Sequence, residues 1–234
     1  MQSDKDMKDI ILENSIKLFF KLGYNKTTMR LIATESGIKH PSIYKHFKNK
    51  DEIMSIFVFR YIRGIVKMTQ RYILDHIGIS KHDAFLFYWT AHLYYSSYDE
   101  RFRRYQLEQL NTSSNQILNV NNDYFAQVFT NIMHWEFNKT PKEHKIYSQV
   151  LYSIVIIISN MYMKEEIEMS FALSEMFDLM YSVVGEKNPV DEDYVKKFID
   201  ALDFDAYLNK DLLEDVFLSD FGTAYKGTSN DLFS

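Results

Sequence analysis

The chain has 234 residues, of which 46% are hydrophobic and 25% are charged. This composition is apolar enough to build one or two packed cores, and it excludes a disordered chain. There is no cysteine, which excludes disulfides, thiolate zinc sites and cysteine nucleophiles, and a cytoplasmic location is the default expectation. Residues 1–8 lack the apolar stretch of a secretory signal. The most apolar run, 150–158, is shorter than the roughly 20 residues that span a bilayer, so no membrane segment is expected.

The net charge of −5 is unevenly distributed along the chain. Residues 1–71 hold 14 Lys and Arg against 7 Asp and Glu, whereas residues 72–234 hold 13 against 25. A basic front end with an acidic remainder is expected when only one part of a protein meets phosphate. Solvated charged surfaces can produce the same asymmetry, so charge alone leaves both interpretations open.

An all-α fold is favoured, because glycine and proline are rare and the alternating pattern of strands is absent. The first expected helix ends at Gly23, and the second begins after a cap at Thr27 or Thr28 and ends at Gly37. The third has Pro41 in its first turn and ends near His46-Phe47, and the fourth begins after a cap at Asn49. The apolar face of the fourth helix, at about 50–74, is Ile53, Ile56, Phe57, Tyr61, Ile65, Met68 and Tyr72.

Residues that signal the start or end of a helix are sparser in the second half of the chain. The capping box Thr140-Pro141-Lys142-Glu143 sets a helix start at 141. The helices expected here are about 81–98, 101–111, 121–138, 141–163, 168–184, 191–202 and 209–220.

Two short helices that meet at Gly37 and are followed by a long helix are typical of a helix-turn-helix, whose second helix enters the DNA major groove. Residues 27–53 read TTMRLIATESGIKHPSIYKHFKNKDEI. With Phe19-Phe20 and Gly23-Tyr24, this stretch resembles the DNA-binding signature of the TetR family of bacterial repressors. The resemblance implies an all-α protein with an N-terminal three-helix helix-turn-helix domain, residues 1–50, and a C-terminal helical ligand-binding and dimerisation domain, residues 51–234.

The resemblance also implies which side chains meet DNA. Arg30 lies where the founding member of the family has an arginine that reads a guanine, and a guanidinium can bond O6 and N7 of that base together. Lys50 is expected to meet a phosphate at the start of the fourth helix. Lys39 replaces a small polar residue of the family, so it cannot cap the recognition helix, but it can reach phosphate. The expected DNA-binding residues are Thr28, Arg30, Lys39, His40, Pro41, Ser42, Tyr44, Lys45, His46 and Lys50. The expected core of this domain is Ile32, Ala33, Ile38, Ile43 and Phe47.

The helix expected at 141–163 is apolar on two faces. One stripe is Ile146, Val150, Ile154, Ile157 and Met161, and the other is Tyr147, Leu151, Val155, Ile158 and Tyr162. Such a helix must bury both faces, so one stripe is expected in the chain's own core and the other against a second subunit. The alternative is that both stripes lie in one large monomer core. The candidate dimer-interface residues are Tyr147, Leu151, Val155, Ile158, Tyr162, Met169, Leu173, Met176 and Met180.

Aromatic residues are dense at 85–105, where they occupy nine of 21 positions. Family members carry an effector cavity between these helices, so the aromatic side chains could line a site for a small hydrophobic ligand. The alternative is an ordinary core. The candidate ligand-binding residues are Phe85, Tyr88, Trp89, His92, Tyr95, Phe102, Tyr105, Phe125, Phe129 and Trp135.

Other functional classes find less support. The chain has no glycine-rich phosphate loop, no histidine pair with zinc spacing and no nucleophile motif, so no catalytic residue, metal or cofactor is assigned. The basic residues accompany a helix-turn-helix and not one amphipathic helix, which disfavours a membrane-surface protein. The expected function is a homodimeric repressor of a palindromic double-stranded DNA operator, released by a small hydrophobic effector. A DNA-binding regulator controlled by a protein partner stays open as the alternative.

Overall fold

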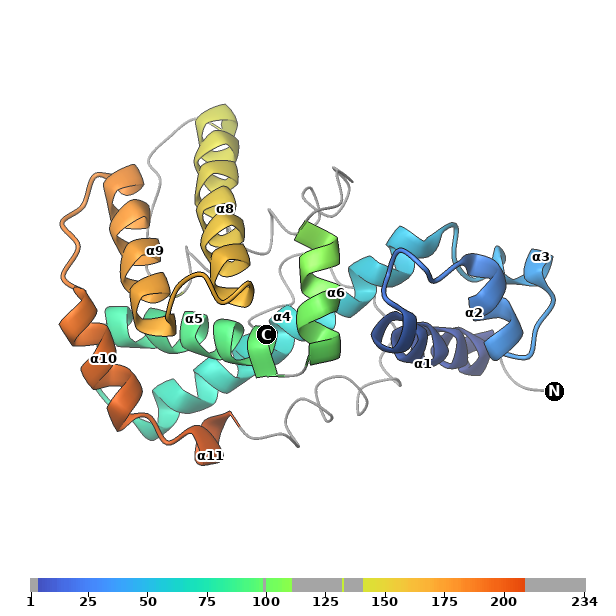
Figure 1. Cartoon of the computed structure of the whole chain (residues 1–234), viewed down its shortest axis with the longest axis horizontal. Helices are drawn as coiled ribbons and strands as arrows, with labels where there is room; N and C mark the ends of the chain where they lie inside the picture. The colour runs from blue at the N-terminus through green and yellow to red at the C-terminus, as the bar shows by residue number, and fades with distance from the viewer. Residues whose placement is uncertain (1–3, 99, 111–131, 133–140, 209–234) are drawn as a thin grey trace.

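The computed structural model describes residues 4–98, 100–110, 132 and 141–208 (Figure 1). Within these residues every regular element is a helix, which confirms the all-α fold. The helices are α1 Asp4–Leu22, α2 Met29–Glu35, α3 His40–Ile43, α4 Lys50–Asp75, α5 Lys81–Tyr98, α6 Glu100–Leu110, α8 Pro141–Met163, α9 Met169–Val184, α10 Glu192–Ala201 and α11 Phe204–Tyr207.

Figure 1 shows two groups of helices joined by α4. Helices α1, α2 and α3 form the small group at one end, and α4 runs from them into the larger group, where α5 packs against it. In the larger group α8 packs against α9, and α10 contacts α9 and α5. Helix α6 stands between the groups and contacts α1 on one side and α5 and α8 on the other. Both α4 and α6 therefore connect the two groups.

The turns of the small group follow from local sequence signals. Gly23 and Gly37 have φ angles of 87° and 69°, in the left-handed region that favours glycine. Thr28 caps α2, because its hydroxyl accepts the N–H of Leu31 at 3.2 Å. Asn49 caps α4 in the same way, through the N–H of Glu52 at 2.8 Å. The caps and glycine stops predicted from the sequence are thus confirmed.

A small apolar core holds α1, α2 and α3 on the start of α4. Of the five residues expected in it, Ile38 is half-buried and the rest are almost completely buried. The buried members are Ile32, Ala33, Ile43 and Phe47.

Helix α4 has 26 residues and is therefore about 39 Å long at 1.5 Å per residue. Its buried residues include the whole apolar face expected from the sequence, namely Ile53, Ile56, Phe57, Tyr61, Ile65, Met68 and Tyr72. One continuous helix thus carries packing from the small group into the larger one.

Some expected boundaries differ from the structure. Helix α3 ends at Ile43, before the end expected near His46, because the chain tightens there into three-residue turns from Lys45 to Ser42 and from His46 to Ile43. The expected helices 121–138 and 209–220 and the cap at Thr140 lie outside the described residues, apart from Ile132.

The two apolar stripes of α8 have opposite surroundings. Leu151, Val155 and Ile158 are buried in the chain's own core. Ile146, Val150 and Ile157 are 58%, 42% and 58% exposed. This corrects the expected dimer surface, since the stripe assigned to a partner is buried or half-buried. In the other stripe Ile146, Val150 and Ile157 are exposed, and Ile154 and Met161 are half-buried. On α9 the candidates Leu173, Met176 and Met180 are also buried, while Tyr147, Tyr162 and Met169 are half-buried.

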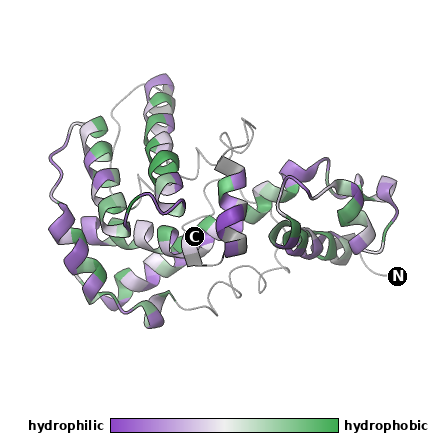
Figure 2. Cartoon of the chain, viewed as in Figure 1, coloured by the Kyte–Doolittle hydropathy of each residue, from purple (hydrophilic) through white to green (hydrophobic). Residues whose placement is uncertain are grey.

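The apolar character of α8 extends beyond residues 150–158, the most apolar run of the sequence (Figure 2). Its residues Ile146–Met163 have a mean hydropathy of 1.4 and could cross a membrane by length and composition, and 39% of this stretch is buried inside the chain. Helix α8 also packs against three other helices. The stretch is therefore partly buried by these helices and partly exposed.

Candidate nucleic-acid interface

The outer surface of α3 presents polar and aromatic side chains. Ile43 and Phe47 are buried, whereas Tyr44 is 49% exposed. The Tyr44 hydroxyl lies 3.2 Å from Nε2 of His40, and their rings meet edge to face with centroids 5.3 Å apart. The two rings therefore form one exposed unit, which can reach base edges or phosphates together. Among the DNA-binding candidates, the exposed residues are Thr28, Arg30, Lys39, His40, Pro41, Tyr44 and Lys45, and Ser42 and His46 are half-buried.

Arg30 lies in the first turn of α2, where its side chain is exposed. Its position next to the capped end of the helix fixes its backbone, since Thr28 bonds the N–H of Leu31. Lys39 occupies the N-cap position of α3 and makes no side-chain cap, as its residue type predicts. Arg30 and Lys39 thus offer cationic groups at the starts of the two short helices.

In the structure Lys50 makes contacts within the chain, and its expected phosphate contact stays a prediction. Its Nζ donates to the carbonyl oxygens of Tyr24 at 2.6 Å and Thr27 at 2.9 Å. The same ammonium lies 3.8 Å from the centroid of the Tyr24 ring. Burial lowers the pKa of Lys50, although the charges of Asp51 and Glu108 act in the opposite direction. Lys50 therefore ties the start of α4 to the turn between α1 and α2.

Tyr24 completes this tie with a second polar contact. Its hydroxyl donates to the carboxylate of Asp51, the residue that follows Lys50. Burial, together with this carboxylate, raises the pKa of Tyr24 well above its ordinary value. The phenol therefore stays protonated and remains a donor over the physiological range.

Two exposed lysines join the candidates that the sequence indicated. Lys26 lies in the turn between α1 and α2, and Lys48 lies between α3 and α4. They carry charge next to the two short helices without belonging to either one. Their signal in the sequence was their place in the turns that flank the helix-turn-helix, because phosphate contacts come from such flanking backbone as well as from helices.

The aromatic candidates whose side chains the structure describes pack together in the core. Trp89 stacks edge to face with Tyr88 at 5.0 Å and with Phe85 at 5.9 Å between centroids. The Tyr61 hydroxyl lies 3.1 Å from Nδ1 of His92, whose pKa burial lowers to about 4. The candidates Phe85, Tyr88, Trp89, His92 and Tyr95 are all buried, and the side chains of Phe102, Tyr105, Phe125, Phe129 and Trp135 lie outside the described residues.

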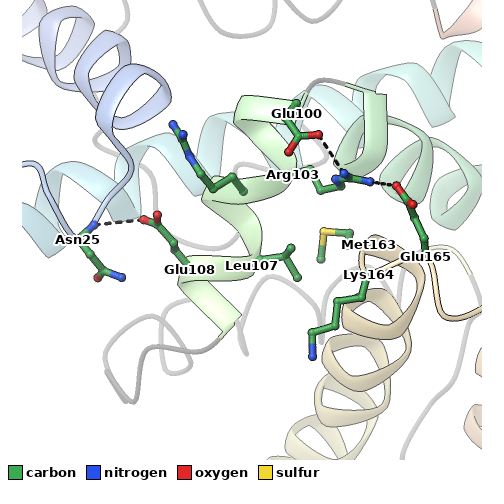
Figure 3. Close-up of a pocket in the computed structure, with 9 residues that line it drawn as sticks. Asn25, Glu100, Arg103, Leu107, Glu108, Met163, Lys164 and Glu165 are labelled. Carbon is green, nitrogen blue, oxygen red and sulfur yellow. Dashed lines mark hydrogen bonds and ion pairs between the residues drawn. The ribbon is translucent and has the colours of Figure 1, made fainter.

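A cavity of about 600 Å³ lies at the junction of the two groups, and none of the five ligand candidates whose side chains the structure describes lines it. It is walled by α6, the end of α8 and Asn25 in the turn between α1 and α2 (Figure 3). Most of its described lining residues carry charge, and they are Asn25, Glu100, Arg103, Arg104, Leu107, Glu108, Met163, Lys164 and Glu165.

Comparison with known proteins agrees with this arrangement. Residues 11–55 match the family described as "Bacterial regulatory proteins, tetR family". The chain is 42% identical over 67 residues to the biofilm operon icaADBC HTH-type negative transcriptional regulator IcaR of Staphylococcus aureus strain Newman, covering 27% of this chain and 36% of that protein. It is 29% identical over 133 residues to the protein of the same name from Staphylococcus epidermidis, covering 57% of this chain and 68% of that protein.

The matched stretch thus spans about a third of the length of the S. aureus relative. Among solved structures, Thermus thermophilus FadR, a TetR family transcriptional repressor in complex with lauroyl-CoA, superposes with a TM-score of 0.57 at 10% identity, over 78% of this chain and 98% of that chain. That likeness shows a shared fold. The family match coincides with most of α1, with α2 and α3, and with the start of α4, so residues 11–55 are similar to the DNA-binding region of the tetR family of bacterial regulatory proteins.

Proposed function

We propose that the chain is a transcriptional repressor that binds a double-stranded DNA operator with the domain of residues 1–50, while residues 51–234 form a dimerisation and effector domain. The observation that carries the proposal is the exposed, cation-bearing outer side of α2 and α3 within a matched helix-turn-helix. Both named relatives are negative regulators, which supports repression. A cytoplasmic, non-enzymatic protein fits this role.

Arg30 allows a direct test of sequence reading. A duplex is first selected from genomic fragments, and its affinity is compared with that of an unrelated duplex. Arg30→Lys keeps the charge but loses the two-pronged geometry, whereas Arg30→Ala loses both. If Arg30 reads a guanine, both variants lose preference for the selected duplex, and only the alanine variant shows a weaker salt dependence. A wild-type protein that selects no sequence would overturn the proposal.

A homodimer is the second part of the proposal, and the outward faces of α8 and α9 support it. Ile146, Val150 and Ile157 recur at helical spacing on α8, and Phe171 and Leu179 are 41% and 43% exposed on α9. The two helices pack side by side, so their exposed apolar residues belong to neighbouring helices. Two copies of this pair can cover one another in a four-helix interface, and the symmetric dimer would present two recognition helices to a palindrome.

Neighbouring residues of α8 provide a matched pair for this test. Ile157→Asp puts a charge on the outward face, so it is expected to give a folded monomer in sedimentation experiments. Ile158→Asp puts the same charge in the core, where Ile158 is almost completely buried, so it is expected to unfold the chain. A wild type that sediments as a monomer at micromolar concentration would contradict the dimer.

A small hydrophobic effector is the third part of the proposal, and the aromatic density of α5 supports it. Because the described rings pack against one another, a ligand has to open this core in order to bind it. Such a ligand is expected to raise the melting temperature in a thermal-shift screen and to lower operator affinity by the same factor by which operator lowers ligand affinity. Equal ligand constants with and without operator would favour control by a protein partner.

A further inference from the structure

Helix α6 supplies polar caps to the small group of helices. The last carbonyls of α1 have no partner within that helix, and Arg104 donates to those of Phe20 at 2.9 Å and Lys21 at 3.3 Å. A cation at this position also meets the negative end of the helix dipole. One turn further along α6, the carboxylate of Glu108 accepts the N–H of Asn25 at 3.2 Å (Figure 3). A single face of α6 thus holds both the end of α1 and the turn that follows it.

The neighbouring face of α6 holds the end of α8. Arg103 donates to the carboxylate of Glu165, and its other terminal nitrogen donates to Glu100 at 2.9 Å. Figure 3 shows the Arg103 guanidinium between these two carboxylates. The hydrogen bond to Glu165 is the main cause that raises the pKa of Arg103. Both contact faces of α6 border the ionic cavity.

Glu165 stands in a backbone conformation that suits glycine. Its φ is 61°, which makes it the one non-glycine residue with positive φ among the residues that the structure describes. The N–H of Glu166 bonds the carbonyl of Met161 at 3.0 Å and that of Glu165 bonds Tyr162 at 2.9 Å, the pattern that usually ends a helix with glycine. A residue with a Cβ is strained in this conformation. Such strain indicates that the contact of the Glu165 carboxylate with Arg103 has a role of its own.

The ion pair between Arg103 and Glu165 stabilises the fold too little to offset this strain. The side chain of Glu165 is 75% exposed, and exposed ion pairs stabilise a fold very little. Glycine at position 165 would end α8 with less strain. The carboxylate of Glu165 therefore acts by holding Arg103 in place, which also holds α6 between the two groups.

We propose that Arg103 and Glu165 are positioning residues that fix α6 to α8 and thereby set the orientation of the DNA-binding group. We call the contacts of Arg103 with Glu165, Arg104 with the end of α1, and Glu108 with Asn25 the α6 clasp. The inference rests on the proposed function, because two recognition helices of a dimer must match major grooves about one helical turn apart. The clasp limits the half-site spacings that the dimer accepts.

Glu165→Gly provides the main test, since it removes the carboxylate and relieves the strain and so keeps the chain folded. Glu166→Gln is the control, because it removes a charge from the next exposed residue of the same turn. Affinity is measured for the selected operator and for duplexes whose centre is one or two base pairs longer or shorter. The preference of the wild type for its own spacing is expected to fall at least about fivefold in Glu165→Gly. It is expected to persist in Glu166→Gln.

An unchanged spacing preference in Glu165→Gly would overturn the clasp. A second measurement, amide hydrogen exchange at Asn25, needs no DNA. The clasp predicts that Glu165→Gly speeds this exchange at least about fivefold while global stability is unchanged or higher, and an unchanged rate would also overturn it. If the wild type selects no operator but Glu165→Gly still speeds amide exchange at Asn25, the result would contradict the proposed function and support the clasp.

Discussion

Lys50→Met tests whether this lysine stabilises the DNA-binding group or contacts phosphate. Methionine keeps the apolar stem of the side chain and removes the ammonium. The ammonium makes two hydrogen bonds, of 2.6 and 2.9 Å, to backbone carbonyls and lies over the Tyr24 ring. A hydrogen bond to a charged group contributes about 1.5–3 kcal/mol net, and an exposed cation–π contact about 0.5–1 kcal/mol.

The expected loss is smaller than the sum of these contributions. Lys50 is only half-buried, so water can reach the carbonyls of Tyr24 and Thr27 after the substitution. The lowered pKa of Lys50 also shows that burial of the ammonium opposes part of the gain. We therefore expect Lys50→Met to lower the free energy of unfolding by about 2 kcal/mol, measured by urea denaturation.

Lys45→Met is the matched control, because Lys45 is exposed beside the recognition helix. If Lys45 meets phosphate, its loss reduces the slope of log K against log salt by about 0.9 for each phosphate contact, and stability changes little. Lys50→Met is expected to leave that slope unchanged at temperatures where it is folded. A Lys50 variant of normal stability with a reduced salt slope would refute the structural role and restore the phosphate contact.

Two further predictions concern stability. Gly23→Ala and Gly37→Ala both place a Cβ at positive φ and should each lower the free energy of unfolding by about 1 kcal/mol. Only the first is expected to lower it further and to speed Asn25 amide exchange, because its Cβ would lie 2.5 Å from Oε1 of Glu108 and nothing lies within 4 Å at Gly37; equal effects in both measurements would contradict the Glu108 contact. His92, with a pKa lowered to about 4 by burial, stays neutral in the fold while the unfolded chain takes up a proton near pH 6.5. Its contribution to stability is therefore full above pH 6.5 and falls by about 3 kcal/mol as the pH drops to 4; denaturation across this range should show a flatter pH dependence for His92→Gln, and parallel curves would contradict it.

Local signals explain why much of the fold could be predicted from the sequence. A cap such as Thr28 or Asn49 acts within three residues, and a left-handed glycine such as Gly23 or Gly37 acts at its own position. The buried face of α4 follows from helical spacing alone. These features depend on neighbours along the chain, so one sequence contains what is needed to place them.

Contacts across the chain could not be predicted in this way. The partners of Lys50 are the carbonyls of residues 26 and 23 positions earlier, and backbone carbonyls carry no sequence signal. The turn at Glu165 has no glycine, so the sequence gives no signal for its left-handed conformation. Only the backbone angles of the structure show it. The link between Arg103 and Glu165 joins positions 62 residues apart.

The choice between the two stripes of α8 shows a further limit of periodicity. Both stripes are apolar at helical spacing, so the pattern predicts two buried faces without telling which one turns inward. In the structure the inward side includes Ser148 and Ser159, whereas the outward stripe exposes Ile146 and Ile157. A monomer gains nothing from placing isoleucines toward water and serines toward its core. The distribution is reasonable if the outward stripe is also buried, and a second copy of α8 and α9 supplies an apolar surface of the same kind.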